Sequence, residues 1–461
     1  MIGAKMEENN RKKSSGYALI PFLVFVVIYF STGIILQNQG VEMAFYQMPA
    51  PVAAFVAVIV AFVMFKDDLN TKFANFIAGC GNEDIISMCL IYLLAGAFSA
   101  VAEASGGRDA VVNLGLKFIP PSLIIAGIFV IAGFMATATG TSVGTVSSLT
   151  TVTIGLAQGA GLNIAMSLAA LVSGSMFGDN LSIISDTTIA STKTQNVSMK
   201  DKFRMNMKIA LPAAIIAIIL FIVLGRPDSA VDIPTGPVEI IKVLPYLLVL
   251  ITALIGINVF VVLTSGILFS GIIMLFQNGF DLLGLSKLVY EGFTSMTEIF
   301  LLSMMIGGLS YMVNKEGGLD FINDKILSFV KSKKSAEIGI CLIVFLMDIS
   351  IANNTVSIVI AGPIAKRLSN DYKVDPRRAA SLLDIFACVG QGLIPYGIQL
   401  LVAAKFTEGL LAPVDIMPYL FYQYLLAAFA ILSIFVRYAE SKDPWNYEHD
   451  MPESQVLELA K

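Results

Sequence analysis

A few aspartates lie inside long apolar stretches of this 461-residue chain. Asp179 and Asp186 are in the first half, and Asp348 and Asp384 are in the second. An ionised carboxylate at the centre of a membrane helix costs about 2.5 to 3.5 kcal/mol on insertion scales, so such residues are seldom accidental. One carboxylate can hold either a proton or a metal cation. Competition between these ions is the simplest way to couple their movements, so we expect Asp179 and Asp186 above all to bind ions.

Side chains that carry oxygen atoms surround these aspartates in the sequence. Sodium is a hard ion that binds carbonyl, hydroxyl and carboxylate oxygens, and a broken helix adds unpaired backbone carbonyls to that set. The N-terminal ends of broken helices suit an anionic substrate group instead. The candidate ion- or substrate-binding residues are Thr141, Ser142, Asp179, Asn180, Ser182, Asp186, Thr187, Asp348, Asn353, Asn354, Thr355 and Gln391. The candidate sodium ligands among them are Asp179, Asp186, Asn353 and Thr355.

Each of these assignments has a structural alternative. Asp179 and Asp186 could instead cap a helix or form an ion pair near a membrane boundary. Serine and threonine in membrane helices often bond to their own backbone or bridge neighbouring helices. Asp384 follows Arg377 and Arg378 closely, so an interfacial salt bridge explains it as well as a substrate contact does.

Polar interruptions recur at one constant shift between two halves of the chain. Gly140-Thr141-Ser142 and Gly178-Asp179-Asn180 interrupt the first half, and Asn353-Asn354-Thr355 and Gly390-Gln391-Gly392 interrupt the second. Interrupted apolar segments at matching positions of two halves point to a binding site at the membrane midplane. The sequence therefore predicts an all-α polytopic membrane protein of two inverted-topology repeats, each with about five transmembrane helices, a re-entrant hairpin and a broken helix.

The domain boundaries follow from this repeat. Re-entrant hairpins are expected because their tips are polar but lack lysine and arginine, and non-helical backbone at membrane depth must be buried in protein or line a cavity. The predicted units are a first repeat at 1–225 with its hairpin at 118–158 and broken helix at 163–192, a linker at 226–237, a second repeat at 238–438 with its hairpin at 335–368 and broken helix at 379–406, and a cytoplasmic tail at 439–461.

Composition excludes several classes of protein. The chain is 56% hydrophobic and 14% charged, and its mean hydropathy is +0.79, as expected of a polytopic membrane protein. Its formal net charge is −4 and its basic residues form short clusters, so nucleic-acid binding is not expected. There is no Walker-type phosphate loop, so ATP-driven pumping is not expected. We expect a transporter and not an enzyme.

Cysteine and histidine offer little chemistry. The 4 cysteines are scattered without a CxxC pair, so neither a metal site nor a disulfide is expected from them. The only histidine, His449, lies in the polar tail, so proton coupling must depend on carboxylates.

Lysine and arginine gather on one side of the predicted membrane. Most of the 30 basic residues fall in the two terminal segments and in 66–84, 193–208, 313–334 and 366–378. Short cytoplasmic loops of membrane proteins are enriched in these residues. The sequence therefore predicts a protein of the cytoplasmic membrane with these segments and both termini in the cytoplasm.

The stretch from Phe177 to Thr188 reads FGDNLSIISDTT. It resembles the FGDKMSPLSDTT signature of the NhaC family of sodium/proton antiporters, in the ion transporter superfamily, and it keeps both aspartates at the same spacing. The resemblance implies a scaffold domain and a transport domain with hairpins and broken helices. It also marks Asn353-Asn354-Thr355 as a tip of the kind that binds sodium and carboxylates. Asn180 replaces the lysine of the signature, and Ile183-Ile184 replaces its Pro-Leu, so a positive charge is missing from this stretch.

Two functional hypotheses follow. The first is a secondary active antiporter that exchanges Na⁺ for H⁺ by alternating access, with Asp179 and Asp186 alternating between the two ions. The second is a sodium- or proton-coupled transporter of a small amino acid or carboxylate, bound by the Asn353-Asn354-Thr355 tip and the facing break. No cofactor is expected besides the transported Na⁺ and H⁺. The expected partners are monovalent cations and the lipid bilayer, and a homodimer is compatible with the sequence.

Overall fold

The computed structural model describes residues 14–39, 41, 47–183, 185–227, 239–255, 257–276, 281–441 and 445. This part of the chain is helical and contains no β-strand. Most of the predicted linker at 226–237, and most of the predicted tail with His449, lie outside the described residues.

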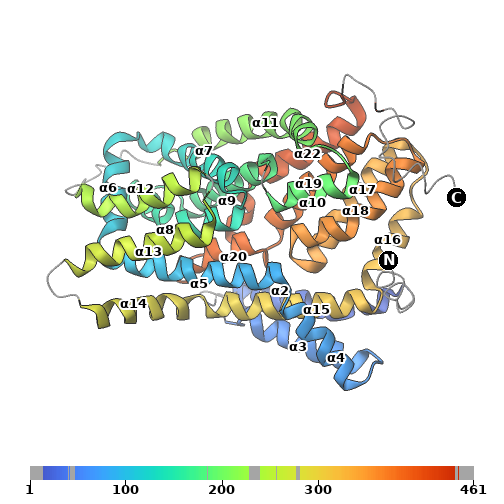
Figure 1. Ribbon diagram of the computed structural model, residues 1–461, viewed down its shortest axis with the longest axis horizontal. Helices are drawn as coiled ribbons and strands as arrows, with labels where there is room; N and C mark the ends of the chain where they lie inside the picture. Colours follow the sequence, from blue (N-terminus) through green and yellow to red (C-terminus); the bar gives the residue numbers. More distant parts are fainter. Residues whose placement is uncertain are drawn as a thin grey trace.

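Figure 1 shows the helices in their arrangement along the chain. In chain order they are η1 (Gly16–Leu19), α2 (Ile20–Asn38), α3 (Ala50–Met64), α4 (Leu69–Cys80), α5 (Glu83–Ala104), α6 (Gly107–Phe118), α7 (Pro121–Thr139), α8 (Ser142–Gly159), α9 (Ile164–Leu181), α10 (Asp186–Gln195), α11 (Met199–Leu224), α12 (Ile240–Leu254), α13 (Val259–Leu275), α14 (Leu282–Ser295), α15 (Thr297–Lys315), α16 (Gly318–Leu327), α17 (Lys333–Ile351), α18 (Asn354–Asp371), α19 (Pro376–Leu393), α20 (Ile398–Lys405), α21 (Pro413–Ile416), η3 (Met417–Tyr419) and α22 (Phe421–Val436).

Several helices are long and apolar enough to cross a membrane. There are 6 of them in the described part of the chain, or up to 7 if the pair Pro413–Tyr419 and Phe421–Val436, bent by 54°, forms one span. Further apolar helices, such as α3 and α13, are shorter. The all-α polytopic membrane fold is thus confirmed, whereas the number of spans in each repeat and the inverted orientation of the repeats stay predictions.

The order of elements around the interruptions is the same in both halves. The hairpin α7–α8 is followed by the broken helix α9–α10, and the hairpin α17–α18 is followed by the broken helix α19–α20. The first arms, α7 and α17, each have 19 residues. The second arms, α8 and α18, each have 18. This order agrees with the predicted repeats, whose boundaries stay a prediction.

Each hairpin tip is a short turn followed by an N-cap. Gly140 ends α7 with φ at 71°, a left-handed conformation that glycine adopts at little cost. Thr141 then caps α8, because its Oγ1 accepts a hydrogen bond from the Gly144 N–H at 3.3 Å. At the second tip Ala352 has φ at 54°, and Asn353 caps α18 through its side-chain oxygen. Both chain reversals therefore place polar groups at a helix N-terminus.

The glycines near the breaks do not themselves interrupt the helices. Gly178 and Gly390 lie in the last turns of α9 and α19, and the breaks follow at 182–185 and 394–397. A Cβ on Gly178 would collide with the carbonyl oxygen of Gly133 in α7, and one on Gly390 would lie 2.6 Å from Oδ2 of Asp348. These glycines permit close helix packing, as small residues do between membrane helices.

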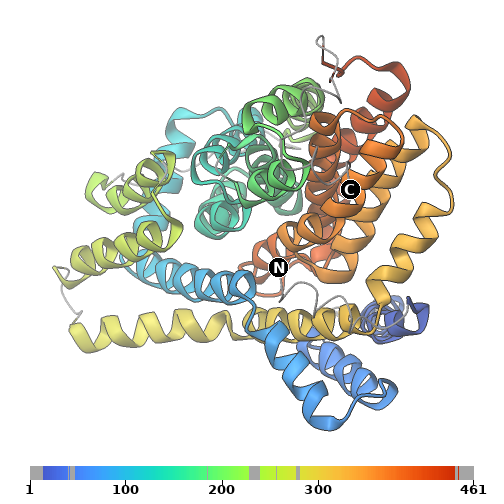
Figure 2. The ribbon, with the colours of Figure 1, turned by 45° about the vertical axis from the view of Figure 1, so that its right-hand side comes forward.

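Two hydrophobic cores divide the described chain. The smaller core joins α2, α3 and α15, and the larger one contains the hairpins and broken helices. Helices α14 and α15 are separated only by Met296 and form a rod along one side of the molecule, with α2 to α4 beside α15 (Figure 2). The scaffold and transport domains that the family resemblance implies stay a prediction.

Candidate functional site

Both hairpin tips and the first broken helix line a cavity of about 500 Å³. Helix α5 forms another wall, and Gln399 of α20 contributes from the second broken helix. The exposed residues Glu83 and Lys193 also line it, and both lie in segments predicted to be cytoplasmic. The predicted site residues that this cavity brings together are Thr141, Ser142, Asp179, Asp186, Thr187, Asn353, Asn354 and Thr355.

Asp179 lies deep in this cavity and is only 4% exposed. Its Oδ2 accepts a hydrogen bond from the Ser142 hydroxyl at 2.7 Å, and its Oδ1 accepts one from the Ser185 hydroxyl. The Ser185 and Thr187 hydroxyl oxygens are 2.9 Å apart. The first hairpin and the break after α9 therefore meet on one carboxylate, whose hydrogen-bond donors among the described side chains are neutral hydroxyls.

Two glutamines connect the second broken helix to this carboxylate. The Gln399 amide donates to Ser142 Oγ at 3.0 Å, and the Gln391 amide donates to Gln399 Oε1 at 3.1 Å. Gln391 is buried and reaches Asp179 only through this chain of hydrogen bonds. The sequence analysis missed Gln399, although Gln399 matches Thr187 at the same shift that relates the two sets of interruptions.

Asp186 lines the same cavity at a different position. It is the first residue of α10 and its side chain is exposed. A negative charge is favourable beside a helix N-terminus, so the capping alternative accounts for part of its placement. Both aspartates of the predicted pair thus line one cavity, but Asp179 is buried and Asp186 is exposed.

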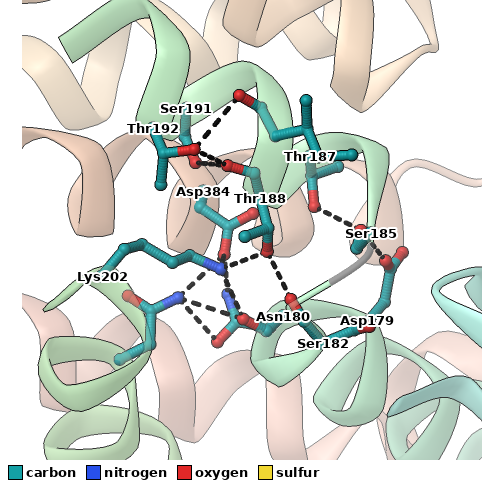
Figure 3. A network of polar contacts seen from close by, with 12 residues as sticks. Asp179, Asn180, Ser182, Ser185, Thr187, Thr188, Ser191, Thr192, Lys202 and Asp384 are labelled. Carbon is teal, nitrogen blue, oxygen red and sulfur yellow. Dashed lines mark hydrogen bonds and ion pairs between the residues drawn. The ribbon is translucent and has the colours of Figure 1, made fainter. Parts of the chain in front are cut away.

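A second polar cluster lies next to the break between α9 and α10 (Figure 3). It is formed around Lys202 and Asp384, and we call it the cluster behind the break. Lys202 and Asp384 are 1% and 0% exposed, and their Nζ and Oδ2 atoms are 2.6 Å apart. The Lys202 ammonium also donates to the Asn180 carbonyl oxygen and to Thr188 Oγ1, both at 2.7 Å. The Asn180 and Asn206 amides each donate to Asp384 Oδ2 at 2.8 Å. This cluster ties α9, α10, α11 and α19 together around a buried ion pair.

The salt bridge considered for Asp384 exists, but with a different partner. Arg377 pairs with Asp375 at 2.6 Å and Arg378 pairs with the buried Glu337 at 2.9 Å, so Asp384 is left to Lys202. The sequence analysis counted Lys202 as a basic residue of a cytoplasmic segment and overlooked it as a site residue.

The spacing along α11 offers a signal that the sequence analysis did not use. Lys202 and Asn206 are four residues apart, and that spacing places both on one face of a helix. The expectation that this stretch lacks a positive charge was wrong, because the Lys202 ammonium supplies one at the carbonyl oxygen of Asn180.

The remaining predicted residues lie outside the cavity lining. Ser182 donates to the Thr137 carbonyl oxygen at 2.8 Å and so joins the break to the first hairpin. Asp348 is 0% exposed in the last turn of α17, against Gly390. Direct ion binding by these two residues, and by Asn180 and Gln391, stays a prediction.

A second cavity of about 560 Å³ lies at the opposite ends of the same helices. Helix α5 lines it from Gly96 to Glu103, α8 contributes Thr151 and α20 contributes Lys405. Because α5, α8 and α20 each line both cavities, the two cavities are separated by only a short stretch of each helix.

A helical membrane protein with a polar cavity between hairpin tips and broken helices is a secondary transporter. A sequence profile of the Na⁺/H⁺ antiporter family matches residues 12–226 and 231–439. The chain belongs to this family, and the resemblance to NhaC is confirmed.

Three relatives are identical to the chain at about a fifth to a quarter of the aligned residues. The Na⁺/H⁺ antiporter NhaC of Bacillus subtilis is 26% identical over 390 residues, which cover 77% of this chain and 84% of the relative. The malate-2H⁺/Na⁺-lactate antiporter of the same organism is 24% identical over 390 residues, covering 76% and 82%. The arginine/ornithine antiporter ArcD of Halobacterium salinarum is 21% identical over 421 residues, covering 84% and 85%.

A solved structure also covers most of the chain. The YdaH transporter of Alcanivorax borkumensis aligns over 81% of this chain and 89% of its own, at 13% identity and a TM-score of 0.43. This likeness is too weak to support an argument about the chain.

Proposed function

We propose that the chain is a secondary active antiporter that exchanges Na⁺ for H⁺ across the cytoplasmic membrane by alternating access, with Asp179 as the exchanging carboxylate. The observation that carries this proposal is the geometry of Asp179. It is buried at the cavity, and hydroxyls from two discontinuous segments contact its two oxygens. Membership of the Na⁺/H⁺ antiporter family supports the choice of ions.

The hydroxyls make the exchange chemically simple. A serine hydroxyl can donate one hydrogen bond and accept two. With a bare carboxylate, Ser142 and Ser185 donate to Asp179, as they do in this structure. With sodium bound, each hydroxyl rotates and offers its oxygen as a ligand. With a proton bound, one hydroxyl accepts the carboxyl hydrogen. One carboxylate therefore alternates between the two ions without a change of its neighbours.

The other cavity residues have supporting roles in this proposal. Asp186 at the cavity wall raises the local concentration of cations. Asn353, Asn354 and Thr355 of the second tip face the same cavity and supply further oxygen ligands when the cavity closes. The cavity in this structure is the cytoplasmic one, if the charge-based topology holds.

A small carboxylate or amino acid is the second candidate for a substrate. A cavity of about 500 Å³ is far larger than a sodium ion requires. The N-termini of α8 and α18 face it, and helix N-termini attract anionic groups. Two relatives carry names that include malate and lactate, or arginine and ornithine.

Purified protein in proteoliposomes tests both candidates. An inward Na⁺ gradient is expected to drive H⁺ out, as reported by a pH-sensitive dye, in the wild type and not in Asp179→Asn. The assay is repeated with a panel of small carboxylates and amino acids. If proton movement requires one of these compounds, the amino-acid or carboxylate transporter is favoured. If the Na⁺ gradient drives no proton movement in the wild type, Na⁺/H⁺ exchange is ruled out.

A further inference from the structure

The Lys202 ammonium occupies a position with the character of a cation site. A backbone carbonyl, a hydroxyl and a carboxylate contact it, from Asn180, Thr188 and Asp384, at 2.7, 2.7 and 2.6 Å. The carbonyl belongs to the last turn of α9, where unpaired carbonyls and the helix dipole attract positive charge. These are the three kinds of oxygen that bind sodium at broken membrane helices.

We propose that Lys202 is a resident cation that permanently fills a second monovalent-cation site at Asp384 and so limits ion exchange to Asp179. This inference rests on the proposed function of Asp179. It assigns to the cluster behind the break a role in setting how many sodium ions the protein binds.

The cluster has more oxygen acceptors than an ordinary ion pair requires. Asp384 Oδ1 and Asn206 Oδ1 are buried without a hydrogen-bond partner among the described residues. Buried acceptors without donors are costly and usually have an explanation such as a missing ion. Burying a charged pair is itself unfavourable, and packed apolar side chains are often as stable in its place. These unpaired oxygens are expected if the cluster is a cation site in which the Lys202 ammonium takes the place of a free ion.

Charge balance gives the proposal its consequence. Lys202 cancels the charge of Asp384, whereas Asp179 forms no ion pair among the described residues and stays available to a transported ion. Removing the lysine leaves two carboxylates beside the same break, connected through the adjacent residues Asp179 and Asn180. The vacated oxygens of Asn180, Thr188 and Asp384 then bind a second sodium ion.

Equilibrium binding of radioactive sodium to the purified full-length protein in detergent tests this count. Choline replaces sodium to keep the ionic strength constant, and bound sodium per protein is measured at saturation. We expect Lys202→Ala to bind one sodium ion more per protein than the wild type. The double variant Lys202→Ala/Asp384→Asn is expected to return to the wild-type amount, because it removes both charges. Lys200→Ala, a change of an exposed lysine on the same helix, is expected to match the wild type.

The outcomes separate this inference from the proposed function. If Lys202→Ala binds the same amount of sodium as the wild type, the proposed role of Lys202 is wrong, but the proposed function of Asp179 still stands. No sodium bound by the wild type, or full binding by Asp179→Asn, would overturn the proposed function as well. If Lys202→Ala is not recovered as folded protein, Asp384→Asn decides. In Asp384→Asn the Lys202 ammonium has lost its counter-charge, so its repulsion is expected to weaken sodium binding about tenfold. A sodium affinity equal to that of the wild type would contradict the proposal.

Discussion

Asp179 and Asp384 show how two buried carboxylates acquire different roles. Asp384 has a lysine at 2.6 Å and two amide donors. Asp179 has serine hydroxyls and faces a cavity. A carboxylate with a fixed counter-charge has no need of a second cation, whereas one with neutral neighbours does. These different environments are the reason why we propose Asp179, and not Asp384, as the carboxylate that exchanges ions.

Replacing Asp179 by asparagine is expected to abolish coupled transport while the protein stays folded. The amide keeps the size of the side chain, but it can neither release a proton nor attract sodium as a carboxylate does. Sodium-driven proton movement in proteoliposomes measures the effect. Asp371→Asn, at an exposed ion pair with Arg367, is the matched control and is expected to transport normally. Normal transport by Asp179→Asn would mean that this carboxylate only holds the first hairpin in place.

Several candidate residues that line the cavity could be found from the sequence because their chemistry is visible locally. Asp179, Asp186 and the tip residues are polar groups in apolar stretches, and eight of the predicted residues line one cavity. Lys202 escaped notice because its burial depends on the packing of α11 against α9, α10 and α19. Lys202 lies near the start of a helix, where an exposed lysine is ordinary.

At the scale of elements, glycine packing holds the first hairpin against the first broken helix. A Cβ on Gly174 would strike the Phe129 carbonyl, and one on Gly178 would strike the Gly133 carbonyl, so α7 and α9 touch along their backbones. The sequence predicted where polar and glycine-rich interruptions occur. It misplaced the breaks because glycine suits close contact between helices as well as a helix end.

Gly178→Ala is expected to destabilise the protein, because its methyl group has no room against α7. Gly127→Ala on α7 is the matched control, since a Cβ there would meet no atom within 4 Å. Thermal unfolding in detergent should show a lower midpoint for Gly178→Ala, by several degrees. The control should be unchanged or slightly more stable, because alanine favours helices by about 1 kcal/mol over glycine. Equal midpoints would contradict the role of Gly178 in packing.

The two hairpin tips are expected to contribute comparably to sodium affinity. Thr355→Ala in the second tip and Ser142→Ala in the first should each raise the sodium concentration for half-maximal transport. Asn353 also caps α18, so Asn353→Ser is the informative change, because serine keeps the cap while removing the amide. Unchanged half-saturation in all three variants, at normal protein abundance, would show that the tips only pack.

At the scale of the whole molecule, the charge-based topology predicts which segments a labelling reagent can reach from outside the cell. Lys200→Cys and Lys373→Cys place reactive groups on exposed positions of two segments predicted to be cytoplasmic. Both are expected to resist an impermeant thiol reagent in intact cells and to react once the membrane is opened. Lys202 is unsuitable for this experiment because it is buried. Reaction of either cysteine from outside would reverse the predicted orientation.

The whole-molecule fold was predictable to the level of its class. Apolar periodic stretches mark membrane helices individually, and the recurring interruptions mark hairpins and breaks. The separation into two cores could not be seen, because it depends on long-range contacts such as those of α15 with α3 and α4.

The thin barrier between the two cavities has an electrical consequence. On α8 the linings of the two cavities end at Val143 and Thr151, a rise of about 12 Å along a helix. A hydrocarbon core is about 30 Å thick. If the two cavities open to opposite faces of the membrane, as the predicted topology implies, solution in each cavity carries the potential of its own bulk phase. The membrane voltage would then fall mainly across this barrier. A charge that crosses it gains about 2.3 kcal/mol per 100 mV over a movement of less than half the bilayer.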